Sequence, residues 1–112
     1  MKKYEIWIAD LNPQLGTETG KIRPVVIVQS NLLNGIHSST LICPLNTNIR
    51  YGVTILRIHL RAGIAGLTQD SDIMIDQLSA IDNRRLRHKI GILDIALRRQ
   101  LDENIKTVLD LI

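Results

Sequence analysis

Aromatic side chains are scarce in this 112-residue chain, which has one tryptophan, two tyrosines and no phenylalanine. Proteins that bind single-stranded nucleic acid by stacking successive bases need several aromatic faces. A nucleic-acid interface in this chain must therefore depend on charge and hydrogen bonds. The formal net charge of +3 and the sequence pI of about 9.4 favour a polyanionic partner but do not establish one.

Cysteine is also scarce, and long apolar runs are absent. The one cysteine, Cys43, lies in an apolar run, and we interpret it as a small buried hydrophobic residue in a reducing compartment. No apolar stretch is long enough to cross a bilayer, and no signal peptide opens the sequence. These features predict a cytoplasmic protein without membrane contact, built as a single domain over residues 1–112.

The motifs of several common chemistries are missing as well. His37, His59 and His88 are scattered without the spacing of metal ligands, and Asp70 and Asp72 lie close together but are too few for a metal site. The sequence has no phosphate-binding P-loop, no GxGxxG before a helix and no GxSxG. We therefore expect neither a metal nor another cofactor.

Apolar periodicity predicts a β-rich fold that ends in one helix. Strand-like alternation or β-branched composition occurs at residues 4–10, 24–29, 40–45, 53–60, 72–78 and 89–93. Residues 97–112 show helical spacing, with Asp94 as the N-cap. Strands first and a helix last indicate an α+β fold or a small barrel with a helical lid.

Polar residues gather at the expected strand ends. Residues 16–24 carry two glycines, Glu18, Lys21 and Arg23 between two apolar segments. A loop hinged by glycine can bend over a ligand, while Arg23 at the mouth of a strand can present its guanidinium to a phosphate. Asn46, with Thr47 and Asn48 after it, follows the third strand.

Each of these groups also has a structural interpretation. Glu18 and Arg23 can form a loop ion pair, and residues 46–48 have good turn chemistry. Asp76 and Gln77 lie within an apolar segment, where they cost free energy unless they are paired, for example with Arg23 or a backbone amide. The arginines of residues 83–88 form either a solvated face or a phosphate contact.

Four collinear segments resemble the MazF/PemK (Kid-like) toxin family. Residues 6–13 and 16–26 resemble its opening, residues 42–45 its third strand, and residues 70–82 its segment around Asp76 and Gln77. Arg85 and residues 90–93 then lead into a terminal helix, as in that family. The resemblance covers nearly the whole chain.

The resemblance implies a small SH3-like antiparallel β-barrel with a C-terminal α-helix, usually a homodimer. It implies a metal-independent, sequence-specific endoribonuclease that cuts single-stranded RNA and leaves a 2′,3′-cyclic phosphate and a 5′-hydroxyl. The implied partner is a MazE-like antitoxin whose disordered tail occupies the RNA groove.

Site residues follow from the same resemblance. Catalysis is assigned to Arg23, which stabilises charge on the phosphorane, with Thr47 and with Glu18, which orients Arg23 or acts as the base. The residues assigned to RNA binding are Asn12, Thr17, Lys21, Asn46, Asn48, Asp76 and Gln77.

One position departs from the family pattern. Family members commonly have a catalytic threonine two residues after the proline of the third strand, where this chain has Asn46. Three interpretations are open. Thr47 takes over through a local shift, or Asn46 holds a phosphate oxygen through its amide, or cleavage is impaired and only binding remains.

Two further functions stay open at this point. A toxin of the same barrel fold can act on a protein such as gyrase, although the intact segments around Arg23 and around Asp76 and Gln77 argue against it. A purely structural SH3-like module would leave Glu18, Arg23, Asp76 and Gln77 unexplained.

Overall fold

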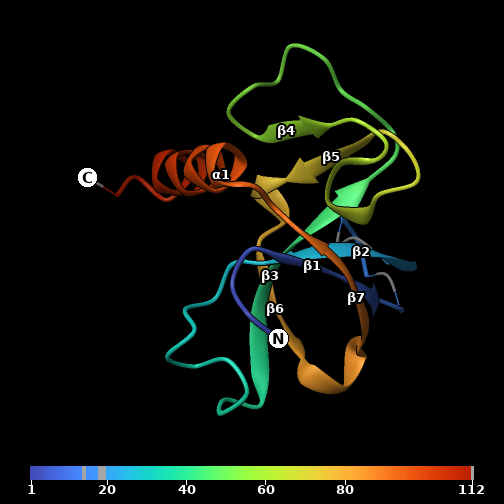
Figure 1. Ribbon diagram of the computed structural model, residues 1–112, viewed down its shortest axis with the longest axis vertical. Helices are drawn as coiled ribbons and strands as arrows, with labels where there is room; N and C mark the ends of the chain where they lie inside the picture. Colours follow the sequence, from blue (N-terminus) through green and yellow to red (C-terminus); the bar gives the residue numbers. More distant parts are fainter. Residues whose placement is uncertain (14, 18–19, 112) are drawn as a thin grey trace.

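Seven antiparallel strands and one C-terminal helix form the fold in the computed structural model, which describes residues 1–13, 15–17 and 20–111 (Figure 1). The strands are β1 (Glu5–Asp10), β2 (Ile22–Ile27), β3 (Ser39–Asn46), β4 (Arg57–Leu60), β5 (Ser71–Met74), β6 (Ser79–Asp82) and β7 (Leu86–Ile92). The helix α1 spans Ile95–Val108, and the short 3-10 turns are η1 (Ile64–Gly66), η2 (Ile75–Gln77) and η3 (Asn83–Arg85). The predicted α+β fold with antiparallel strands and a terminal helix is confirmed.

The sheet runs in the order β4-β5-β3-β2-β1-β7, and β6 pairs separately with β3. The long strand β3 pairs with three other strands. Strand β2 lies along one of its edges, and β5 and β6 pair with different parts of the other edge. The last two residues of β3 pair with β5, and its first four pair with β6. The chain therefore turns between β5 and β6, and η2 is that turn.

Two apolar clusters fill the interior, one on each side of β2 and β3. Val26 and Cys43 belong to a cluster that also contains Leu101 of α1, whereas Val25 and Ile42 belong to a second cluster with Ala9 and Leu11. A strand with both faces buried is what the β-branched run at residues 24–29 predicts. Burial of Leu101 attaches α1 to the sheet.

The helix begins where the sequence places it. Asp94 adopts an extended backbone, and its Oδ1 accepts a hydrogen bond of 2.9 Å from the backbone N–H of Leu97. This contact satisfies one of the free N–H groups of the first turn, as an N-cap does. In the described part of the chain, no helix is long and apolar enough to cross a membrane.

Several predicted strand boundaries are wrong, including that of the last strand, which begins at Leu86 and not at residue 89. The strand expected over residues 53–60 begins only at Arg57, and β2 begins at Ile22, so Arg23 lies inside a strand and not in the preceding loop. The strand expected over residues 72–78 ends at Met74. The chain there leaves β5 through η2 to reach the other half of β3, and alternation along one segment cannot reveal such a change of partner.

Candidate functional site

Arg23 is held by two backbone carbonyls. Its Nε–H donates to the oxygen of Gly20 at 2.8 Å, and Nη1 donates to the oxygen of Leu45 at 3.2 Å. The side chain is half-buried, and this burial lowers the pKa of the guanidinium, which nevertheless stays cationic at neutral pH. Because both acceptors are neutral and a guanidinium has five N–H donors, Arg23 retains charge and donors for an anionic ligand.

Strand register places Arg23 beside Asn46. The ladder between β2 and β3 ends at Val25 and Pro44, and its register, extended by two residues, sets Arg23 opposite Asn46. The hydrogen bond from Arg23 to Leu45 agrees with this placement. Residues directly opposite each other in neighbouring strands share a face of the sheet.

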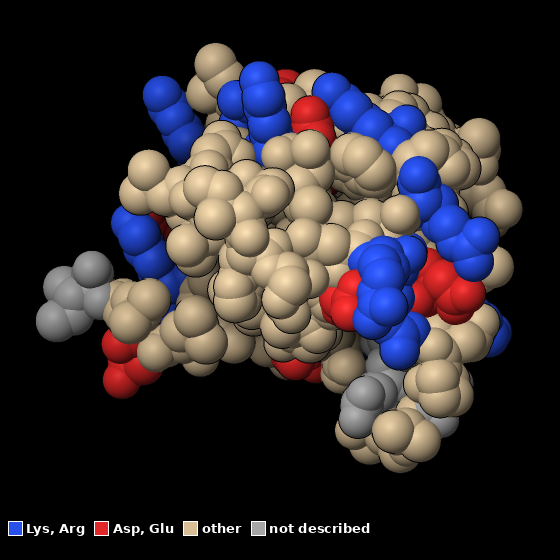
Figure 2. Space-filling model, turned by 90° about the horizontal axis from the view of Figure 1, so that it is seen from below, with Lys and Arg blue, Asp and Glu red and all other residues tan. Residues whose placement is uncertain are grey.

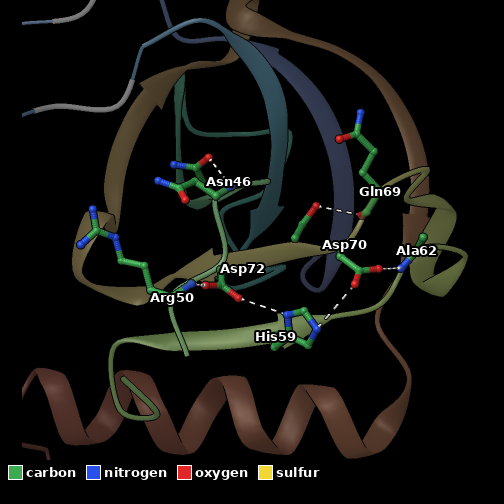
Figure 3. Close-up of polar contacts among 9 residues, drawn as sticks. Asn46, Arg50, His59, Ala62, Gln69, Asp70 and Asp72 are labelled. Carbon is green, nitrogen blue, oxygen red and sulfur yellow. Dashed lines mark hydrogen bonds and ion pairs between the residues drawn. The ribbon is translucent and has the colours of Figure 1, made fainter. Parts of the chain in front are cut away.

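The row continues beyond Asn46. Asn46 pairs with Asp72 of β5, and Asp72 pairs with His59 of β4. Four polar side chains from four strands thus form one cross-strand row, which we define as Arg23, Asn46, Asp72 and His59. Figure 3 shows the Asn46, Asp72 and His59 part of the row.

The segment after β3 is a turn built by side chains. Oδ1 of Asn46 accepts a hydrogen bond of 3.0 Å from the backbone N–H of Asn48, as the turn chemistry of residues 46–48 predicts. The Nδ2 amide of Asn46 remains a donor that can face a phosphate oxygen. Thr47 and Asn48 are exposed. The structure therefore brings Asn46 next to Arg23 and leaves Thr47 on the surface of the turn.

The loop between β1 and β2 is closed at its base. Oδ1 of Asn12 accepts from the backbone N–H of Lys21 at 2.8 Å, so these two predicted RNA-binding residues lie together. Arg85 donates to the carbonyl oxygens of Asp10 and Asn12 and so ties the start of the loop to η3. Thr17 is exposed in the described part of the loop. The predicted catalytic residue Glu18 lies outside the described residues, so its role stays a prediction.

Asp76 and Gln77 line a groove of about 640 Å³. Pro13 of the β1–β2 loop and Arg85 are among its other lining residues. Pro44 also lines it, and the next residue along β3 accepts the hydrogen bond from Arg23, so β3 links the groove to Arg23.

The expectation that Asp76 lies within a strand and needs a structural partner is wrong. Asp76 is exposed in η2, and no described residue donates a hydrogen bond to it. The 3-10 turn directs its carboxylate away from the apolar core and into solvent, and water solvates it there. Burial, with the charge of Asp76 nearby, raises the pKa of the Cys43 thiol to about 12. Cys43 therefore stays protonated and is not a nucleophile.

The arginines around η3 are partly neutralised. Arg84 pairs with Asp82 at 3.0 Å and lowers the pKa of that carboxyl to about 2, and Arg87 pairs with Asp10 at 3.1 Å. Figure 2 views the lower end of the molecule, with blue and red side chains in contact at one edge and a broad uncharged area in the middle. These pairs favour the solvated face over a phosphate contact.

Two features of the site have little signal in the sequence. Arg85 binds the β1–β2 loop from a distance of more than 70 positions along the chain. Asp72 is almost completely buried although an aspartate before an apolar run is typical of a turn. Both depend on contacts between distant segments, which local patterns do not report.

Comparisons with known proteins agree with one another. A family model described as "PemK-like, MazF-like toxin of type II toxin-antitoxin system" matches residues 2–109. Endoribonuclease EndoA of Bacillus subtilis (strain 168) is 30% identical over 112 residues, which cover 100% of this chain and 97% of that protein.

Solved structures have the same fold. The Mycobacterium tuberculosis toxin MazF-mt6 superposes with a TM-score of 0.81 at 26% identity, over 96% of this chain and 98% of that one. A Deinococcus radiodurans chain from a crystal structure of MazE-MazF superposes with a TM-score of 0.79 at 18% identity, over 100% and 97%.

Proposed function

The chain belongs to the PemK-like, MazF-like toxin family of type II toxin–antitoxin systems, and on this premise we propose that it is a sequence-specific endoribonuclease. It cuts single-stranded RNA without a metal ion. The observation that carries the proposal is the Arg23 guanidinium, which two neutral carbonyls hold. One of these carbonyls belongs to Leu45, which lies on β3 between Asn46 and Pro44 of the groove. A preorganised cation of this kind stabilises charge that develops in a transition state.

The proposed reaction is transfer of the phosphate to the neighbouring ribose oxygen. The 2′-hydroxyl loses its proton as its oxygen forms a bond to phosphorus, the bond to the 5′-oxygen breaks, and that oxygen takes up a proton. The products are a 2′,3′-cyclic phosphate and a 5′-hydroxyl.

Each site residue has a role in this step. Arg23 and the Nδ2 amide of Asn46 donate to the nonbridging oxygens as the pentavalent phosphorus forms. Glu18 is proposed to accept the 2′ proton or to orient Arg23, and Thr47 to supply a hydroxyl from the turn.

RNA is proposed to follow the groove. Asp76, Gln77 and Pro13 line the groove. Asn12, Thr17 and Lys21 belong to the same loop as Pro13 and are proposed to offer donors and acceptors to base edges and phosphates at its edge. Asn48 extends this set on the turn after β3. A MazE-like antitoxin is the proposed inhibitor, in line with the Deinococcus radiodurans complex, and a homodimer is the proposed assembly.

Asn46 favours one alternative, a toxin that binds RNA and antitoxin but cleaves poorly. Its amide cannot carry a proton at ordinary pH, unlike a hydroxyl. Purified protein and an Asn46→Thr variant, incubated with a long unstructured RNA in EDTA, separate the two functions when the new ends are mapped. Discrete 5′-hydroxyl ends from the parent support cleavage, whereas cuts by Asn46→Thr alone support the binding-only alternative.

A further inference from the structure

A buried carboxylate lies next to Asn46 in the cross-strand row. Asp72 is 1% exposed, and Oδ2 accepts a hydrogen bond of 2.8 Å from the backbone N–H of Arg50. Its Oδ1 lies 3.4 Å from Nδ1 of His59, its one side-chain hydrogen-bond partner among the described residues. Burying a carboxylate is costly unless hydrogen bonds and a counter-charge compensate it, so this arrangement needs a reason.

His59 orients that carboxylate. Strand pairing sets the two residues opposite each other, and Nε2 of the ring lies 4.0 Å from Oδ2 of Asp70 (Figure 3). Asp70 is itself fixed, because its Oδ1 accepts from the backbone N–H of Ala62 at 2.8 Å. The Nε2–Oδ2 separation exceeds hydrogen-bond distance, so Asp70 is a neighbour of the ring, whereas Asp72 is its hydrogen-bond partner. Among the described residues, no group of His, Cys, Asp and Glu is arranged to hold a metal ion.

The turn after β3 depends on this carboxylate. Residues 46–50, which we call the 46–50 turn, have two backbone N–H groups satisfied by side chains: that of Asn48 by Asn46, and that of Arg50 by Asp72. The first contact is local, whereas the second attaches the far end of the turn to β5. Asp72 and His59 also line a hollow of about 250 Å³ together with the chain that follows the turn.

We propose that Asp72, oriented by His59, is a positioning residue that holds the 46–50 turn against RNA and thereby sets the nucleotide preference of cleavage. This inference rests on the proposed function. The exposed side chain of Asn48 can hydrogen-bond a base edge only if the turn that carries it is fixed.

The test compares Asp72→Ala with Asp72→Asn, and uses Asp70→Ala as the matched control on the other side of His59. Cut sites on a long RNA are mapped, and KM and kcat are measured on one short RNA that contains the preferred site. Asp72→Ala is expected to raise KM at least about tenfold, with a smaller change in kcat, and to redistribute the cut sites. Asp72→Asn is expected to restore the parent pattern, because its amide oxygen still accepts from Arg50. Asp70→Ala is expected to keep the parent cut sites and the parent KM.

Amide hydrogen exchange in the free protein tests the structural part without RNA. Exchange at Arg50 is expected to accelerate at least about tenfold in Asp72→Ala and to stay unchanged in Asp70→Ala, with thermal unfolding confirming that each variant folds. If Asp72→Ala does not fold, His59→Ala takes its place and is expected to shift the same cut sites to a smaller extent.

Two results for Asp72→Ala overturn the inference. One is unchanged hydrogen exchange at Arg50; the other is faster exchange at Arg50 while the cut sites and the KM stay those of the parent. A parent protein that makes no cuts overturns the proposed function and with it the RNA role. The exchange result then shows separately whether Asp72 holds the turn.

Discussion

Nη1 of Arg23 donates a hydrogen bond of 3.2 Å to the carbonyl oxygen of Leu45, the residue that precedes Asn46. This contact fixes the cation of β2 against the end of β3. It also sets the guanidinium close to Asn46. The account of the site therefore depends on what these neighbouring residues do together.

Asn46 is expected to contribute by hydrogen bonding. Asn46→Ala removes both the amide donor and the acceptor for the backbone N–H of Asn48, so RNA cleavage in EDTA should fall roughly 10²–10³-fold. Asn46→Thr should cleave at least as fast as the parent, because its hydroxyl can accept from Asn48 and also face the phosphate. Initial rates on one short RNA measure both. Parent-like cleavage by Asn46→Ala would remove Asn46 from the mechanism.

Gly66 is expected to be required by packing. A Cβ at Gly66 would lie 1.9 Å from the carbonyl oxygen of Ile90 in β7, whereas one at Gly63 would meet nothing within 4 Å. Both glycines have a positive φ, so Gly63→Ala is a control for backbone strain. Denaturant unfolding should find Gly66→Ala about 1–3 kcal/mol less stable than Gly63→Ala, because β7 must move. Equal stabilities of Gly66→Ala and Gly63→Ala would show that η1 shifts to accommodate the added Cβ and that β7 stays in place.

Glu5 is expected to make stability depend on pH. Burial raises the pKa of this carboxyl, but hydrogen bonds from Lys89, Trp7 and the backbone of Lys2 outweigh it, and the net pKa lies below 4.5. Glu5 therefore stabilises the fold above about pH 4.5, and the effect is lost as the pH falls through the lowered value.

The variant Glu5→Gln should be about 1–3 kcal/mol less stable than the parent at pH 7, and the deficit should shrink at acid pH. Denaturant unfolding at a series of pH values measures it, with exposed Glu103→Gln as the control. A deficit that stays constant from pH 7 to pH 3 would exclude the ionised carboxylate as its cause.

The parts of the fold that depend on neighbours in the sequence could be predicted. The N-cap at Asp94 and the doubly buried run at residues 24–29 follow from local chemistry and composition. Strand β6 was not predicted, because residues 79–82 lack apolar alternation and exist as a strand only through pairing with β3.

In the candidate site, too, single residues could be predicted from the sequence, whereas contacts between distant segments could not. Arg23 and Asn46 stand out in the sequence, since charged and polar residues at strand ends are unusual enough to notice. The contacts of Asp72 with Arg50 and His59 span 22 and 13 positions, and nothing local reveals them. The interior strand position of Arg23 also depends on partners, because Arg23 pairs with Ala9 of β1.

The most direct test of the account compares cleavage by the parent, Arg23→Ala and Arg99→Ala on one unstructured RNA in EDTA, with the ends identified chemically. Arg99 is exposed on α1 and serves as the matched loss of one positive charge. The account predicts discrete cuts with a 2′,3′-cyclic phosphate and a 5′-hydroxyl from the parent and Arg99→Ala, and a loss of at least about 10²-fold in folded Arg23→Ala. Undiminished cleavage by a pure, folded Arg23→Ala preparation would contradict it.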